Sequence, residues 1–237
     1  MMTELQLSEI RHYLLSKKLP IDILLEVQDH FISQIQDLMM EENLDFEMAF
    51  TKAKELWQPE LKTKVPFYVL NNRGKAGITK IERRFRRESD RILFQYAIFS
   101  FIVAFAFLLL LIKIIGFDYY KIIVTGFLYF SLAICMVPLF YNYFVNSFAY
   151  EKKYADIRFS IYHWRNIMTL SLGYFGLLYI KPLSDWFPKV IDFDFSWIVL
   201  LKFLIFIVLV TSFIYTGLAQ FKLAKTLKKI KPFLQNI

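Results

Sequence analysis

The stretch ILFQYAIFSFIVAFAFLLLLIKII, residues 92–115, decides the fold, because it carries a single charged side chain, Lys113. An apolar run of about 20 residues is long enough to cross a bilayer as an α-helix. Three further runs follow at residues 122–144, 166–180 and 195–221; the third is the shortest and spans roughly 22 Å at 1.5 Å per residue. We expect the third helix to borrow Ile161, Tyr162 and Trp164, with Arg165 reaching the headgroups.

The composition of the rest of the chain agrees with a membrane protein. Hydrophobic residues make up 57% of the 237 residues, and Phe alone supplies 26. A soluble protein of this size has too little interior to bury so much apolar surface. The lone cysteine, Cys135, excludes an intrachain disulfide, and we find no Cys/His cluster at metal-binding spacing. We therefore predict no metal and no cofactor.

Basic residues flank the four runs unevenly. Seventeen lie in residues 73–91 just before the first run, between the second and third runs, and after the fourth, whereas three lie in the other two loops, namely Lys121, Lys181 and Lys189. The positive-inside rule then places both termini in the cytoplasm. The first ten residues, MMTELQLSEI, contain Glu4 and Glu9 and no apolar core, so we expect no cleavable signal peptide and a first insertion element near residue 92.

Residues 1–58 are predicted to form a small domain of three amphipathic helices. Leu5, Ile10, Tyr13 and Leu14 outline the apolar side of the first helix. Pro20 suits the first turn of the second helix, Asp45 is the expected N-cap of the third, and Pro59 is expected to end it. Residues 1–64 contain 12 acidic and 7 basic residues, and this net negative charge argues against direct binding of nucleic acid.

Residues 59–77 are predicted to be a linker, 78–91 a basic juxtamembrane helix, and 222–237 a basic cytoplasmic tail. In the juxtamembrane helix, Ile78, Ile81, Phe85 and Ile92 share one side, which suits the membrane surface. Its arginines are expected to contact anionic lipid headgroups. These are Arg83, Arg84, Arg86, Arg87 and Arg91.

The sequence from residue 15 to 57, LSKKLPIDILLEVQDHFISQIQDLMMEENLDFEMAFTKAKELW, resembles the HAAS family (helical and associated with sensory) and the related permease-prefix domains. The matching pattern is Leu-Pro, then an acidic residue, His and an apolar residue, then a capped helix rich in Glu and Ala. Its residues here are Leu19, Pro20, Asp29, His30, Phe31, Asp45, Glu47 and Ala49. The resemblance covers under a quarter of the chain, and Glu42, Asn43 and Leu44 stand where many members have a Gly before the third helix.

The resemblance implies a cytoplasmic protein-interaction domain in a multi-pass protein of the bacterial inner membrane. Members often accompany PadR-type transcription regulators or sensory membrane proteins, so a regulator of that kind is the protein partner implied. The docking candidates are Asp29, His30, Phe31 and Glu47. Adjacent residues on a helix point about 100° apart, so Asp29 and His30 do not form an acid–base pair, and we predict no catalytic residues.

Three polar residues in or just beyond the apolar runs are candidate site residues. Lys202 is either a substrate or ion contact or a lysine that snorkels to the outer surface, and Asn142 and Asn146 either bind a ligand or bond neighbouring helices. Pro138 is a candidate kink. Glycines at 126, 173, 176 and 217 are candidate sites of close helix contact.

These observations predict a non-enzymatic, all-α membrane protein: a small cytoplasmic three-helix domain followed by a four-helix transmembrane bundle over residues 92–221. Its leading function is protein interaction in sensing or regulation. The alternative is a small transporter, or a membrane subunit of a transport complex, that uses Lys202 and Asn142. Proton and cation carriers usually place an acidic residue at membrane depth, and none of the four runs contains Asp or Glu.

Overall fold

The structure is a computed structural model that describes residues 2–64, 78–147, 160–161, 165–187 and 196–235. Side chains are described in these ranges except at 64, 145–147, 165–168 and 231–235. The chain forms two compact units. The N-terminal unit is Met1–Ser89 with Lys152–Ile161 and Thr226–Ile237, and the bundle unit is Asp90–Glu151 with Tyr162–Lys225.

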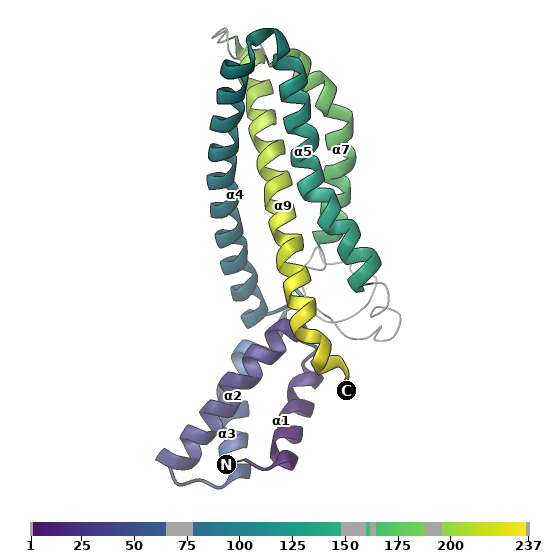
Figure 1. Ribbon diagram of the computed structural model, residues 1–237. Helices are drawn as coiled ribbons and strands as arrows, with labels where there is room; N and C mark the ends of the chain where they lie inside the picture. The colour runs from purple at the N-terminus through teal and green to yellow at the C-terminus, as the bar shows by residue number, and fades with distance from the viewer. Residues whose placement is uncertain (1, 65–77, 148–159, 162–164, 188–195, 236–237) are drawn as a thin grey trace. The chain divides into compact units, whose positions relative to one another are not determined.

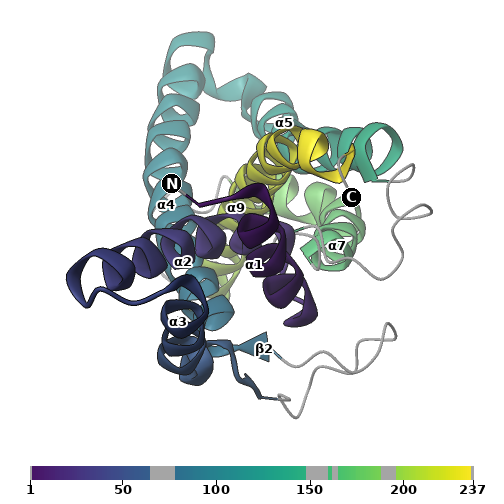
Figure 2. The ribbon, with the colours of Figure 1, turned by 90° about the horizontal axis from the view of Figure 1, so that it is seen from below.

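Three helices build the N-terminal unit: α1 (Glu4–Ser16), α2 (Ile21–Glu41) and α3 (Phe46–Leu61). Thr3 and Gln6 form a reciprocal capping box at the start of α1, which satisfies two otherwise unpaired backbone N–H groups. The predicted N-cap of α3 is confirmed, because Asp45 accepts a hydrogen bond of 2.8 Å from the N–H of Met48. The helix α2 packs against both α1 and α3 (Figure 2).

The core of these three helices is aromatic and aliphatic. Phe31 is fully buried, with ring centroids 5.7 Å from Tyr13 and 6.0 Å from Phe50. Ile10 and Leu14 are also fully buried, as the apolar pattern of the first helix predicts. Leu5 does not belong to the core, since 78% of it is exposed. Burial of a Phe or Leu side chain contributes about 1.5–3 kcal/mol, so a few such residues hold this unit together.

One helix end differs from the sequence prediction, and a second lacks the Gly that is common in the family the sequence resembles. The helix α3 does not end at Pro59 but continues to Leu61, which is buried. A proline removes one hydrogen bond to the residue four positions earlier, and near a helix end the burial of Leu61 offsets that loss. The helix α2 ends without the expected Gly, because Asn43 adopts the left-handed conformation (φ 53°) that favours Gly or Asn at this position.

The two ends of the predicted linker are held together by a short pair of strands. The two-residue strands β1 (Thr63–Lys64) and β2 (Ile78–Thr79) pair antiparallel, with Thr63 opposite Thr79. The predicted basic helix therefore begins at Lys80 rather than at residue 78, and Lys80 forms an ion pair with Glu60 of α3. Residues 65–77 of the predicted linker lie outside the described part of the chain.

Four long helices lie side by side in the bundle unit (Figure 1): parts of α4 (Lys80–Ile115) and α9 (Trp197–Gln235), together with α5 (Tyr120–Tyr141) and α7 (Arg165–Trp186). The short helix η1 (Phe117–Tyr119) precedes α5, and the π-helix η2 (Asn142–Ser147) follows it. Gly116, with φ 113°, makes the turn after α4.

Within the part of the chain that the structure describes, three helical segments are long and apolar enough to cross a membrane: Lys80–Ile115, Phe117–Phe144 and Trp197–Ile230. The third predicted span differs, because the described part of α7 is not among these segments. Asn166, Lys181 and Pro182 lower its mean hydropathy, together with its Ser, Thr and Gly residues. The chain is thus an all-α protein with three short helices followed by long ones.

A cluster of Phe rings packs the interior of the bundle. Its members include Phe105, Phe187, Phe203 and Phe206. Phe206 is fully buried, and its ring centroid lies 5.5 Å from that of Phe187 and 6.1 Å from that of Phe105. The outward faces of the same helices are also apolar; Phe107 of α4 and Leu204 of α9 are each more than half exposed. An interior of Phe surrounded by a surface of Phe, Leu and Ile is what lipid-exposed helices require.

Three of the four predicted glycine contacts are confirmed. A Cβ on Gly173 or Gly176 of α7 would overlap Met136 of α5 and Phe213 of α9, respectively. A Cβ on Gly217 of α9 would lie 2.7 Å from the backbone oxygen of Ile134. Gly126 is the exception, because nothing lies within 4 Å of a Cβ placed there.

Pro138 lies one helical turn after Ile134, where α9 comes close to α5. Proline has no N–H, so the carbonyl four residues earlier, that of Ile134, loses its helical partner. Gly217 lets the α9 backbone come up to that freed carbonyl. Small residues at such positions are how membrane helices pack closely.

Candidate functional site: two buried polar networks

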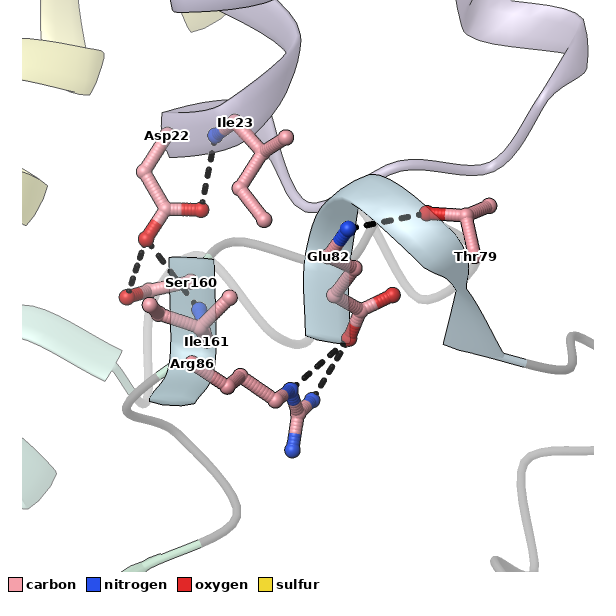
Figure 3. A network of polar contacts seen from close by, with 7 residues as sticks. All are labelled: Asp22, Ile23, Thr79, Glu82, Arg86, Ser160 and Ile161. Carbon is pink, nitrogen blue, oxygen red and sulfur yellow. Dashed lines mark hydrogen bonds and ion pairs between the residues drawn. The ribbon is translucent and has the colours of Figure 1, made fainter. Parts of the chain in front are cut away.

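The first network surrounds Asp22, in the first turn of α2 (Figure 3). One carboxylate oxygen, Oδ2, accepts a hydrogen bond of 2.7 Å from the Ser160 hydroxyl and one of 3.1 Å from the N–H of Ile161. The other, Oδ1, accepts one of 3.0 Å from the N–H of Ile23. Ser160 and Ile161 are themselves buried, so Asp22 joins two segments of the N-terminal unit that are 138 residues apart in sequence.

A second carboxylate belongs to the same network. Glu82, in the first turn of α4, is fully buried and forms an ion pair with Arg86 one turn later, with N–O distances of 2.6 and 3.0 Å. The Thr79 hydroxyl accepts a hydrogen bond of 3.2 Å from the N–H of Glu82 and so caps α4. The pairing with Arg86 offsets part of the cost of burying the Glu82 charge.

Burial raises the pKa of Asp22 above its ordinary value, and the nearby negative charge of Glu82 raises it further. The hydrogen bonds from Ser160, Ile161 and Ile23 favour the ionised form and lower the pKa, but they do not cancel the effect of burial. Asp22 is therefore easier to protonate in the folded unit than in water.

The second network lies inside the bundle, between α5, α7 and α9. The Cys135 thiol and the Thr216 hydroxyl lie 3.0 Å apart, one on α5 and one on α9. Further along, the amide of Asn142 donates to the backbone oxygen of Gln220 at 2.7 Å and to its side-chain oxygen at 3.0 Å. The Gln220 amide reaches the hydroxyl of Thr169 on α7 at 3.5 Å. These hydrogen bonds link α5, α7 and α9 to one another.

A separate hydrogen bond links α4 to α9. The Tyr215 hydroxyl donates to the carboxylate of Asp90 at 3.1 Å. Asp90 follows the arginine-rich start of α4 and precedes its apolar part. The hydrogen bonds between Cys135 and Thr216, Asn142 and Gln220, and Asp90 and Tyr215 thus lie nearer to Lys222 and Lys225 of α9, and Phe203 and Phe206 lie nearer to its start.

The four predicted docking residues do not share one environment. Asp29, His30 and Glu47 are exposed on α2 and α3. Phe31 is fully buried, so its prediction as a docking residue is wrong: the side chain fills the three-helix core against Tyr13, Phe50 and Trp57. Glu47 lines a shallow depression at the start of α3. The other residues lining it are Glu42, Leu44, Met48, Thr51, Lys52 and Glu55.

The predicted headgroup-binding arginines separate into two kinds. Arg83, Arg84, Arg87 and Arg91 are exposed and keep their charges at the surface. Arg86 forms an ion pair with Glu82, and its side chain is only 19% exposed. The side of this helix that was predicted to face lipid carries Ile81, which is buried, beside the buried carboxylate of Glu82. This part of α4 belongs to the N-terminal unit.

The predicted intramembrane residues do not form one site. Lys202 is exposed on α9, whereas Asn142 is buried and bonded to Gln220 on the same helix. Lys202 and Gln220 are separated along α9 by roughly 27 Å at the helical rise of 1.5 Å per residue. The structure therefore does not bring Lys202 and Asn142 together in one cluster. The side chain of Asn146 lies outside the described part of the structure.

The sequence analysis missed the partly buried Asp22 and, among the buried polar residues, Glu82, Thr216 and Gln220. Thr79-Lys80-Ile81-Glu82 matches the Ser/Thr-x-x-Glu capping pattern, which could have located the start of α4. No local pattern marks Asp22, because its partners lie 138 and 139 residues away. Among the described residues, no three His, Cys, Asp or Glu side chains gather in a way that could hold a metal ion.

Comparison with known proteins found no match: no protein-family model, no curated protein and no solved structure is similar to this chain.

Proposed function

We propose that this protein is a membrane-anchored interaction module, in which the N-terminal helices dock a protein partner in the cytoplasm and the bundle crosses the membrane. The observation that carries the proposal is the contrast between the two exposed surfaces. The outward side chains of α4, α5 and α9 are predominantly apolar, and those of α2 and α3 are predominantly polar or charged. A lipid-exposed anchor and a water-exposed domain have these two surfaces.

The proposal includes α7 as a fourth span. Its 22 residues reach about 33 Å at 1.5 Å per residue, which matches a hydrocarbon core of about 30 Å. Its outward side chains at 174, 175, 177 and 178 are Tyr, Phe, Leu and Leu, each about half exposed or more. Four spans return the chain to its starting side, as the distribution of basic residues requires.

The docking surface is the exposed side of α2 and α3, around Asp29, His30 and Glu47. Met48, which is 58% exposed, lies beside Glu47 in a shallow depression lined by three glutamates. An exposed Met is an adaptable apolar contact, and the glutamates favour a partner with a basic surface. The resemblance to HAAS-type domains supports the same reading, with a PadR-type regulator as the candidate partner.

Site-specific photo-crosslinking in the full-length protein tests the docking surface. A photoreactive residue at His30 or Glu47, expressed in membranes, should give an adduct of one defined mass. The adduct from position 30 should be lost when Glu47→Lys reverses the charge. The matched control is Glu9, an exposed acidic residue of α1. Identical adducts at Glu9, or none at positions 30 and 47, would contradict the proposed surface.

Cysteine labelling tests the orientation separately. A membrane-impermeant maleimide should label Phe117→Cys, between α4 and α5, in intact cells. It should label Glu4→Cys only after the cells are permeabilised. The opposite pattern would place the N-terminal helices outside the cytoplasm.

A further inference from the structure

The outward side of α7 carries a stripe of mostly polar residues. Its five members are all exposed and follow one another at alternating spacings of three and four, which places them in one row along an α-helix. These residues, named here the α7 stripe, are Ser171, Tyr174, Leu178, Lys181 and Asp185. The stripe lies opposite Gly173 and Gly176, the two glycines through which α7 packs on α5 and α9. It therefore points straight away from the bundle.

The outward sides of α4 and α9 differ from that of α7 at the middle of the spans. From residue 98 to 110 of α4 and from residue 203 to 213 of α9, every exposed residue is apolar. On α5, which packs against α7, the exposed residue with a hydroxyl at mid-span is Tyr129. The polar outward groups at this depth therefore belong to two helices that pack on each other, whereas α4 and α9 present only hydrocarbon.

Tyr174 is the member of the α7 stripe that lipid suits least. It is 65% exposed, and it lies roughly 13 Å from the first residue of α7 and roughly 18 Å from the last at 1.5 Å per residue. At this depth its hydroxyl reaches neither headgroup layer. Within the described residues the hydroxyl makes no hydrogen bond. A hydroxyl without a hydrogen-bond partner in hydrocarbon is unfavourable, so this position favours a protein neighbour over lipid.

We propose that a second copy of this chain covers the α7 stripe, so that the protein is a dimer in which two α7 helices lie parallel in the membrane. The inference rests on the proposed position of α7 as a span. Basic residues give every copy the same orientation, so a two-fold axis along the membrane normal brings identical residues together at one depth. A hydroxyl both donates and accepts, so one Tyr174 hydroxyl donates to the other. Spacings of three and four are those of paired parallel helices. Lipid then covers the outward sides of α4 and α9.

Disulfide cross-linking of full-length Cys135→Ser protein, in liposomes at low protein-to-lipid ratio, tests the dimer. Tyr174→Cys places a thiol on the stripe. Tyr179→Cys is the matched control, an exposed tyrosine of the same helix that points about 140° away at 3.6 residues per turn. With a membrane-permeant oxidant, Tyr174→Cys should form linked dimers at least roughly tenfold faster, because a disulfide needs Cα atoms within about 7 Å. In a second measurement, energy transfer between labelled copies, Tyr174→Phe should weaken association about threefold and Tyr179→Phe should not.

A water-soluble maleimide separates the failure of the dimer from the failure of the span. If Tyr174→Cys resists the maleimide and forms dimers no faster than Tyr179→Cys, α7 lies in lipid and the second copy alone is overturned. If the maleimide labels Tyr174→Cys readily in open vesicles, α7 lies in water, and the span is overturned as well. A photoreactive residue at position 174 that captures a different protein in cell membranes, without any linked dimer, would also overturn the proposal.

Discussion

The N-terminal unit and the bundle unit have interiors of the same kind and surfaces of opposite kinds. Phe31 in one and Phe206 in the other are both fully buried among aromatic rings. Outside, Leu56 of α3 is an isolated apolar residue among charges, whereas Val103 of α4 is one of a continuous apolar face. The buried residues therefore do not indicate whether lipid or water surrounds each unit, whereas the exposed residues do.

The largest expected effect compares the two interiors. Phe31→Ala should lower the free energy of unfolding of the N-terminal unit by about 3–5 kcal/mol, since it loses both transfer free energy and packing. Phe206→Ala should lower the free energy of unfolding of the bundle by roughly half as much. An unfolded bundle helix stays in lipid, so the substitution leaves a cavity but loses little transfer free energy. Denaturant titration of the full chain in detergent micelles, followed separately for each unit, measures both.

Met48→Ala is the control for the first comparison, because Met48 is exposed and its truncation should change stability by less than about 0.5 kcal/mol. Equal losses for Phe31→Ala and Phe206→Ala would mean that both units unfold into water.

The second prediction compares the two surfaces at matched exposure. Val103 is 54% exposed and Leu56 is 53% exposed. Val103→Arg should cost about 2.5–3.5 kcal/mol, the insertion penalty of Arg at the centre of a membrane helix. Leu56→Arg should be nearly neutral, as a surface change in water usually is. The yield of protein that is extracted folded from membranes measures the difference, and equal yields would remove the distinction between the surfaces.

The third prediction concerns the packing of α9 on α5. Gly217→Ala should lower bundle stability by about 1–3 kcal/mol, because its Cβ would lie 2.7 Å from the Ile134 oxygen and the helices must separate. Gly126→Ala is the matched control, since a Cβ there meets nothing within 4 Å and Ala favours the helix by about 1 kcal/mol. Thermal denaturation in detergent ranks the stabilities of the two variants. If Gly217→Ala leaves the stability of the bundle unchanged, the close contact is disproved.

The smallest effect is expected in the polar network of the bundle. A double-mutant cycle with Asn142→Ala and Gln220→Ala should give a coupling energy of about 0.6 kcal/mol and at most about 1.7 kcal/mol, the average and the maximum for hydrogen bonds between membrane helices. Unfolding in sodium dodecyl sulfate titrations measures all four proteins. A coupling of zero would mean that Asn142 does not bond to the Gln220 side chain, since Gln220→Ala keeps the backbone oxygen.

The features that could be predicted from the sequence are those with local causes. The three N-terminal helices, the Asp45 cap and three of the spans follow from periodicity, side-chain chemistry and the length of apolar runs. Phe31 was misassigned because the resemblance grouped it with its exposed neighbours Asp29 and His30, whereas helical periodicity alone places it with the buried Leu24, Val27 and Ile35.

The features that could not be predicted depend on partners distant in sequence. Gly126 and Gly217 are both glycines within apolar runs. Which of them lies at a close helix contact depends on the position of the neighbouring helix. Asn142 and Gln220 are 78 residues apart, and Asp22 and Ser160 are 138 apart. Such pairs are set by how helices pack, which one sequence does not specify.

The central claim is that lipid covers the outward faces of the bundle and water covers those of the N-terminal helices. Spin labels at Val103 and at Leu56, in full-length protein reconstituted into liposomes with Cys135→Ser, test it by their collisions with oxygen and with a water-soluble nickel complex. The label at position 103 should collide mainly with oxygen, which concentrates in lipid, and the label at position 56 mainly with nickel. Equal access of nickel to both positions would contradict the account.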